Sequence, residues 1–206
     1  MSLSAAAGVR LSRWQPGEPA PAASLSVMTD LPTSAGAAPG PPATPAALPQ
    51  DLAALPPGFA PHTRRSPLTD PWEPLFACLD GHTVQLGLRV REAHCNSRGF
   101  AHGGLVSALA DNAMGLSAVG AARAEAASPG RPAPTGAVTV SLSLDFIASA
   151  GIGDWLSVRP VVLRQGRTLA FVECHVWAQA PAGAGGLQPD AEDRRVARAS
   201  ATFRFT

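Results

Sequence analysis

The segment from Gly103 to about Ala126 constrains the fold more than any other part of this chain. It contains no proline and is rich in Ala and Leu, so it is expected to form one long helix. The glycines at positions 103 and 104 leave its first N–H groups unshielded by side chains, and N–H groups at the positive end of a helix stabilise developing negative charge. The helix therefore starts with a potential oxyanion site, and one carboxylate, Asp111, follows two turns later.

The spacing of these groups predicts a dimer. Asp111 lies roughly 12 Å along the helix axis from Gly103, since each residue advances an α-helix by about 1.5 Å. One substrate carbonyl cannot contact both groups. If the Gly103 N–H polarises a carbonyl and Asp111 directs the attack on it, the two groups come from different subunits, with their helices running antiparallel.

A helical projection separates two stripes that fit this arrangement. The small residues Gly104, Ala108, Gly115, Ala118 and Ala122 fall with Asp111 on one stripe, which could approach the helix of a partner. The second stripe is predicted to pack on a β-sheet and holds Leu105, Leu109, Asn112, Leu116 and Val119. An unpaired buried carboxylate is costly, so an acid among small apolar residues points to function rather than to an ordinary surface position.

Two polar residues before the helix have alternative interpretations. Asn96 has an amide that can donate to a carbonyl oxygen, but a loop asparagine is also a common turn residue. His102 could act as a base, although its position immediately before the helix fits capping or substrate positioning at least as well.

Composition divides the chain into an extension and a folded domain. The first 62 residues hold twelve of the 21 prolines, in Ala- and Pro-rich runs that cannot build a core. We expect residues 1–62 to form a disordered extension and residues 63–206 to form one domain.

Charge and cysteine content exclude several classes of protein. The formal net charge is +1 and there is no basic block, so no nucleic-acid partner is expected. The three cysteines lack the Cys-x-x-Cys spacing of a zinc site, and their odd number does not suit a disulfide framework. Neither a membrane span of about 20 apolar residues nor a secretory signal is evident, so we expect a cytoplasmic protein without a membrane partner or a metal.

Alternating apolar residues predict five strands around the helix. One precedes it, at 82–92, and four follow it, at 137–146, 155–163, 168–178 and 196–205. The short connection at 164–167 predicts a hairpin. One helix against one antiparallel sheet is the simplest way to bury both apolar faces, which places the chain in the α+β class.

From residue 67 to 206 the chain resembles the hotdog-fold acyl-CoA thioesterases, in particular the subgroup of the phenylacetyl-CoA pathway. The resemblance is carried by Asn96, His102-Gly103-Gly104, Asp111, the strand around Thr139 and the stretch from Gln165 to Phe171. It implies a long central helix wrapped by a curved antiparallel sheet, in a dimer whose two sheets are continuous.

The resemblance also implies roles for individual residues. Asn96 and the Gly103 N–H of one subunit would hold the thioester oxygen, with His102 beside them, while Asp111 of the partner acts on water as a base or attacks directly. Thr139 would help to orient the water. Gly104, Arg164 and Arg167 are the expected substrate-binding residues, the two arginines through the phosphates of coenzyme A; the alternatives are an ordinary strand threonine and solvated arginines.

The sequence therefore predicts an acyl-CoA thioester hydrolase that acts as a homodimer or a homotetramer. Coenzyme A is part of the substrate, and no separate cofactor is expected. No Gly-x-Ser-x-Gly elbow occurs, which argues against an α/β-hydrolase. Two alternatives remain: a hotdog hydratase or dehydratase, and a non-catalytic acyl-CoA-binding protein.

Overall fold

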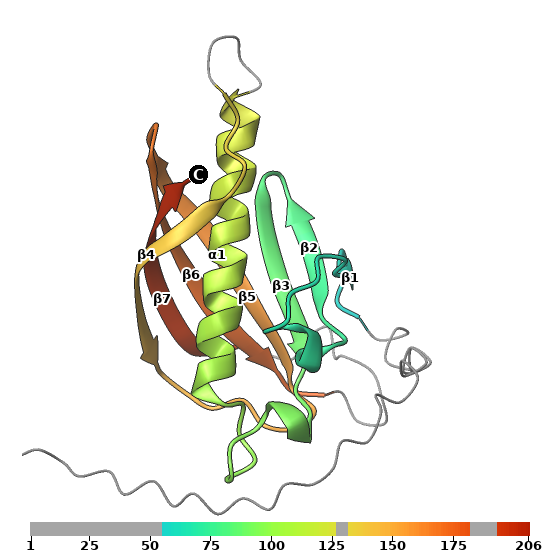
Figure 1. Cartoon of the computed structure of the whole chain (residues 1–206). Coiled ribbons are helices and arrows are strands. Elements are labelled where there is room, and N and C mark those ends of the chain that lie inside the picture. The colour runs from blue at the N-terminus through green and yellow to red at the C-terminus, as the bar shows by residue number, and fades with distance from the viewer. Residues whose placement is uncertain (1–54, 127–131, 182–192) are drawn as a thin grey trace, which may run out of the picture. The chain divides into compact units, whose positions relative to one another are not determined.

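The computed structural model describes residues 55–126, 132–181 and 193–206 (Figure 1). These residues belong to one compact unit that extends to the C-terminal Thr206. Most of the predicted extension lies outside the described residues. The first described strand, at residues 60 and 61, comes just before the boundary predicted at residue 63.

Seven strands and one long helix make up the described structure. In chain order the elements are β1 (Ala60–Pro61), a 3₁₀ turn (Asp70–Trp72), β2 (Phe76–Asp80), β3 (Thr83–Arg89), a second 3₁₀ turn (Glu92–His94), α1 (Gly103–Ala126), β4 (Ala137–Phe146), β5 (Trp155–Gln165), β6 (Leu169–Gln179) and β7 (Arg194–Phe205). The strands form one sheet in the order β1-β2-β3-β5-β6-β7-β4, and every neighbouring pair is antiparallel.

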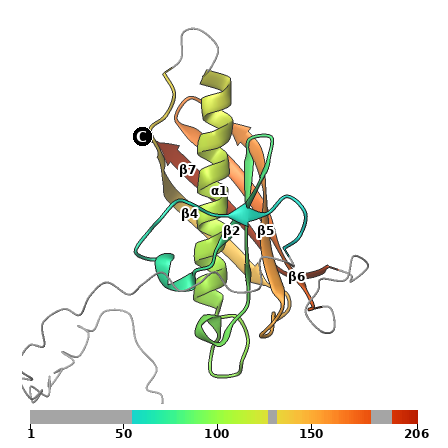
Figure 2. The same ribbon diagram turned by 90° about the vertical axis from the view of Figure 1, so that its right-hand side faces the viewer.

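The sheet curves around α1, which lies across its inner face (Figures 1 and 2). The helix contacts β3, β4, β5, β6 and β7. This is the α+β arrangement predicted from the sequence, and the bounds of α1 agree with the predicted helix.

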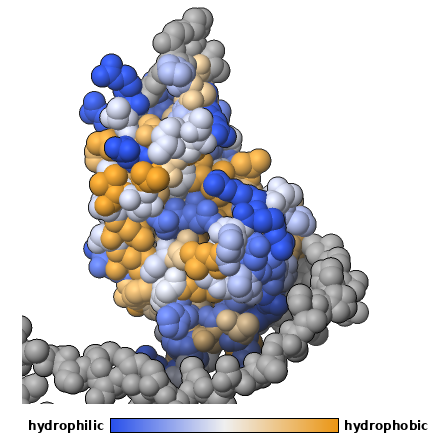
Figure 3. Space-filling model, viewed as in Figure 1, coloured by the Kyte–Doolittle hydropathy of each residue, from blue (hydrophilic) through white to orange (hydrophobic). Residues whose placement is uncertain are grey.

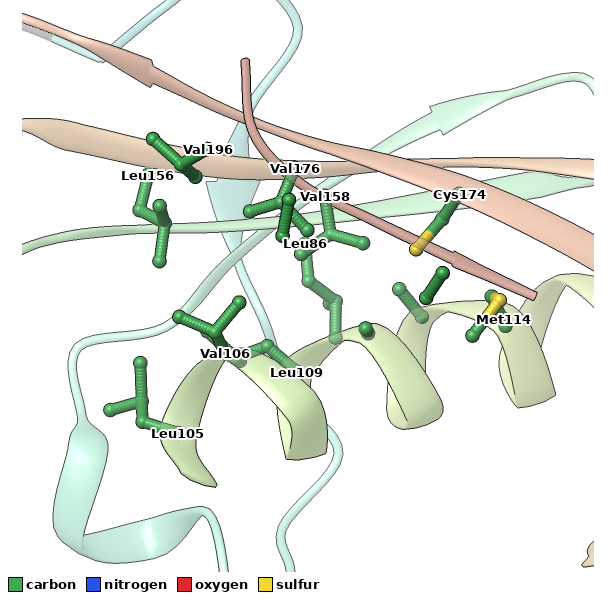
Figure 4. Packing of buried hydrophobic residues seen from close by; sticks show 14 of the residues in the cluster. Leu86, Leu105, Val106, Leu109, Met114, Leu156, Val158, Cys174, Val176 and Val196 are labelled. Atoms are coloured by element: carbon green, nitrogen blue, oxygen red, sulfur yellow. The ribbon is translucent and has the colours of Figure 1, made fainter. Parts of the chain in front are cut away.

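The core lies between α1 and the inner face of the sheet. Leu105, Leu109 and Met114 of the helix belong to one buried cluster with Val158 and Val176 of the sheet (Figure 4). All five side chains are buried. Burying a side chain of this size contributes about 1.5–3 kcal/mol, so this layer is the main source of stability.

The predicted division of the helix surface is partly wrong. Ala118 and Ala122, which we assigned to the stripe facing a partner, are 0% and 1% exposed within the chain itself. Leu116 and Val119, which we assigned to the sheet, are only half-buried. The curved sheet encloses a wider arc of the helix than a flat sheet would, and that arc is rotated from the predicted one.

By length and composition alone, α1 could cross a membrane, and the sequence-based expectation overlooked this. Half of its most apolar 18-residue window is buried inside the fold. Its apolar character is explained by its place as the core helix.

Two further strands, β1 and β2, were not predicted. The segment Phe76-Ala-Cys-Leu-Asp80 is short and lacks a clear alternation of apolar and polar residues. It pairs with β3 through a tight turn at Gly81, whose φ of 59° suits glycine.

The far half of α1 is fixed to the start of β3. The Ser117 hydroxyl accepts a hydrogen bond from the Val84 N–H at 2.9 Å and donates to the Ala113 carbonyl at 2.8 Å. Nearby, a Cβ on Gly120 would lie 2.5 Å from the His82 carbonyl oxygen. The absence of a side chain at Gly120 thus allows the β2–β3 turn to approach the helix.

We predict that Ser117→Ala lowers the free energy of unfolding by about 1–3 kcal/mol, because the Val84 N–H loses its buried acceptor. Ser107→Ala is the matched control, since the Ser107 hydroxyl donates only within the helix, to the Gly103 carbonyl. Urea unfolding followed by circular dichroism measures both. Equal stabilities of the two variants would contradict the proposed anchor.

Candidate functional site

Asp111 and Thr139 form a hydrogen-bonded pair on the open face of the helix. The Thr139 hydroxyl of β4 donates to the Asp111 carboxylate at 2.7 Å. Asp111 is half-buried, and Thr139 lies on the exposed strand beside it. The pair brings together two residues that lie 28 positions apart in the chain, and both had been predicted for the site.

A bulge in β4 follows Thr139 directly. Thr139 pairs with Phe203 of β7 and Ser141 pairs with Thr202, so Val140 is an extra residue. Bulges commonly re-aim a side chain, and this one lets Thr139 face Asp111 while Leu144 further along packs against the core. The bulge was not predicted from the sequence.

The start of α1 has one capped and one free N–H group. His102 Nδ1 accepts a hydrogen bond from the Gly104 N–H at 3.0 Å, as an N-cap side chain does. The Gly103 N–H donates to no group in the described part of the chain. His102 therefore has a capping role here, and it leaves the Gly103 N–H available to a ligand.

Asn96 is both a turn residue and a potential donor. Its Oδ1 accepts hydrogen bonds from the N–H groups of Arg98 at 2.9 Å and Phe100 at 3.4 Å. These contacts fix the side chain, and no described residue accepts from its Nδ2. The amide is thus held in place with its donor group free.

The candidate residues lie in two separate cavities. The first, which we call the Asn96 pocket, has a volume of about 260 Å³ and is lined by Asn96 and Gly103 together with Phe100, Val106, Phe146 and Val196. The second, which we call the Asp111 groove, has a volume of about 440 Å³ and is lined by Asp111 and Thr139 along the exposed face of α1. The two cavities share no lining residue, as expected if one copy of the chain cannot bring Gly103 and Asp111 together.

The chain is similar to esterases and thioesterases in sequence. Residues 98–183 match the family described as the thioesterase superfamily. A proposed esterase of Pseudomonas aeruginosa is 41% identical over 123 residues, which span 59% of this chain and 85% of that protein. The chain belongs to the thioesterase superfamily. Human acyl-coenzyme A thioesterase 13 is 33% identical over 84 residues, 41% of this chain and 53% of the human protein.

Solved structures confirm the fold of this thioesterase-superfamily member. A thioesterase family protein from Silicibacter pomeroyi superposes with a TM-score of 0.53 at 23% identity, covering 68% of this chain and 89% of that one. The PaaI protein of the E. coli phenylacetic acid degradation operon gives 0.50 at 17% identity, over 64% and 79%. The helix wrapped by a curved antiparallel sheet is the hotdog fold.

Two of the predicted substrate-binding residues lie apart from both cavities. Arg164 near the end of β5 and Arg167 in the β5–β6 turn are exposed and line neither the Asn96 pocket nor the Asp111 groove. Gly104 is exposed beside the pocket, with its N–H committed to His102. The contact of the two arginines with coenzyme A stays a prediction.

Two residues that line the cavities were not predicted from the sequence. Phe146 at the end of β4 covers Gly103, where an added Cβ would lie 2.9 Å from its ring. Arg64 lines the Asp111 groove. Neither had a recognisable motif, because each reaches its cavity from a distant part of the chain.

Two of the three cysteines, Cys95 and Cys174, are not activated as nucleophiles. Burial raises the pKa of the Cys174 thiol to about 12. Burial also raises the pKa of Cys95, and the nearby Glu92 carboxylate adds to that effect. A thiolate is the reactive form of cysteine, so neither side chain is poised for nucleophilic attack at neutral pH.

We predict that His102→Ala destabilises the fold by about 0.5–2 kcal/mol, because the helix loses the side chain that caps its Gly104 N–H. His102→Asn is the control, since an asparagine oxygen can accept the same bond. Urea unfolding distinguishes the two variants. A stable His102→Ala protein would show that the cap contributes nothing.

Proposed function

We propose that this protein is an acyl-CoA thioesterase that acts as a homodimer. It hydrolyses a thioester to a carboxylic acid and free coenzyme A at sites shared between two subunits. The separation of the Asn96 pocket from the Asp111 groove carries this proposal. Membership of the thioesterase superfamily supports the reaction class.

The exposed edge strand β4 offers the surface for pairing. β4 is the last strand of the sheet, and its outer edge has no strand beside it among the described residues. Val138, Val140 and Phe146 on it are 49%, 60% and 57% exposed. The space-filling view shows hydrophobic residues, in orange, exposed over β4 (Figure 3). A long apolar edge strand favours pairing with another strand, and a second copy of β4 fits it.

A two-fold axis through such a pair would complete both sites. The Asp111 groove lies at the start of β4, at Ala137 and Thr139, and the Asn96 pocket lies at its end, at Phe146. Antiparallel pairing of two β4 strands places the start of one beside the end of the other. The Asp111 groove of each subunit would then lie next to the Asn96 pocket of its partner. This is the arrangement expected for two antiparallel helices that share their sites.

The assembled groups suit thioester hydrolysis. The free Asn96 Nδ2 and Gly103 N–H of one subunit would donate to the carbonyl oxygen and stabilise the negative charge that develops on it. Asp111 of the other subunit, held by Thr139, would take a proton from water. A bond forms between the water oxygen and the carbonyl carbon, the C–S bond breaks, and the proton passes to the leaving thiolate. No cofactor is needed in this scheme.

We predict that Asp111→Asn lowers kcat by at least about 100-fold, because an amide cannot accept the proton from water. The substitution preserves the size of the side chain and an acceptor for Thr139. Thiol release from a panel of acyl-CoAs measures activity, and size-exclusion chromatography checks the dimer. Unchanged turnover in the folded Asp111→Asn protein would reject the site.

The shared site predicts complementation between two inactive variants. Asn96→Asp removes the Nδ2 donor of the Asn96 pocket and keeps an oxygen that accepts from the N–H groups of Arg98 and Phe100. A heterodimer of Asn96→Asp and Asp111→Asn subunits retains one complete site. An equal mixture with random exchange should recover about a quarter of wild-type activity. No recovery, with heterodimers detected by mass spectrometry, would place each site within one chain.

The same panel distinguishes the two alternatives. Addition of water to an enoyl-CoA, without thiol release, would identify a hydratase. Binding of acyl-CoA without any turnover would identify a non-catalytic binding protein. Neither alternative accounts for the Thr139–Asp111 pair as directly as hydrolysis does.

A further inference from the structure

The Asp111 groove continues well beyond Asp111. It follows the exposed face of α1 past Asn112, Leu116 and Val119 and ends at Arg123, in the last turn of the helix. Asp111 and Arg123 are about 18 Å apart along the helix axis. The groove is therefore much longer than the contact with one carbonyl group requires.

Two arginines lie in the groove, and its negative groups are the Asp111 side chain and the terminal carboxylate of Thr206. Arg64 is exposed and makes no ion pair or hydrogen bond with the described part of the chain. The next residue differs: Arg65 pairs with Asp70 at 3.2 Å and with Glu73 at 3.4 Å. Arg64 is thus the uncompensated charge of this segment, and it lines the groove.

Arg123 is held in place by the backbone. Its Nε donates to the Pro134 carbonyl at 3.1 Å and its Nη2 to the Thr135 carbonyl at 2.9 Å. These bonds leave Nη1 for another acceptor, and the guanidinium forms no ion pair with a described residue. A guanidinium fixed in this way suits an anionic oxygen.

The two cavities differ in what they can bind. The Asn96 pocket is lined largely by apolar side chains, including Phe100, Phe146 and Val196, which suit an acyl group, and Arg98 is its one charged lining residue. The groove presents polar side chains along its length, among them the half-buried amide of Asn112. No described residue pairs with that amide, so it is available to a polar ligand.

We propose that Arg64 and Arg123, which line the same groove as Asp111, bind anionic groups of the thioester substrate. This inference rests on the proposed function, because it takes Asp111 as the reacting end of the groove. Two anions fit the chemistry: a phosphate of coenzyme A, reached through its pantetheine arm, and a carboxylate at the far end of an acyl chain. The polar groove and the apolar pocket favour the phosphate.

The test compares Arg64→Gln with Arg65→Gln. Both substitutions remove one exposed arginine charge from adjacent positions, but only Arg64 lines the groove. Each variant is assayed with one acyl group carried by coenzyme A and by pantetheine, which has no phosphate. A pair of acyl-CoAs with and without a terminal carboxylate completes the set.

For a phosphate ligand, Arg64→Gln should raise KM for every acyl-CoA about tenfold, with kcat and the KM for acyl-pantetheine unchanged. For a carboxylate ligand, the KM should rise only for the carboxylated acyl group, on either carrier. Arg65→Gln should change neither KM. Equal KM values in the wild type and Arg64→Gln, or equal increases in both variants, would overturn the proposal.

Direct binding separates this inference from the proposed reaction. Calorimetric titration of the full chain with free coenzyme A and with pantetheine requires no turnover. Weaker binding of coenzyme A alone by Arg64→Gln would support the anion site even if the wild type hydrolysed no thioester. If the wild type hydrolyses thioesters and Arg64→Gln binds coenzyme A as tightly as the wild type, the thioesterase proposal stands and the anion site is rejected.

Discussion

The packing of one long helix against one curved sheet determines where chemistry can occur in this protein. Leu105, Leu109 and Met114 commit one face of α1 to the core, and the sheet covers that face from β3 to β4. Asp111, Asn112 and Val119 lie at the margin of that face, where they are half-buried and line the Asp111 groove together with residues of the sheet. A carboxylate and an amide can be half-buried there without disrupting the core, because their side chains line a groove rather than the cluster of buried apolar residues.

The rigidity of the same helix explains why the site is divided. An α-helix cannot shorten the distance of about 12 Å between the Gly103 N–H and Asp111. The structure accordingly places them in two cavities, at opposite ends of the ten-residue strand β4. A dimer related by a two-fold axis resolves this separation without any change in the helix, and it covers the apolar edge that β4 exposes.

The sequence predicted the regular elements well and their packing less well. The helix was predictable because proline is absent from 103–126, and five strands, β3 to β7, were predictable from their alternation. Ala118 and Ala122 were misplaced because periodicity gives the angle between residues but not the arc that a curved sheet encloses. The Asp111–Thr139 pair was expected from family resemblance. Arg64 could not be assigned to the groove, since only the folded chain brings that segment to the helix.

The bulge at Val140 links the core to the site. Strand residues alternate between faces, so Thr139 and Leu144, five positions apart, would face opposite sides of a regular strand. The extra residue shifts the register between Thr139 and Ser141, and both side chains can then face the helix. Leu144 packs on the core, while Thr139 donates to Asp111. A strand without the bulge would have to give up either the apolar contact or the hydrogen bond that holds the carboxylate, so the irregularity serves both the fold and the proposed chemistry.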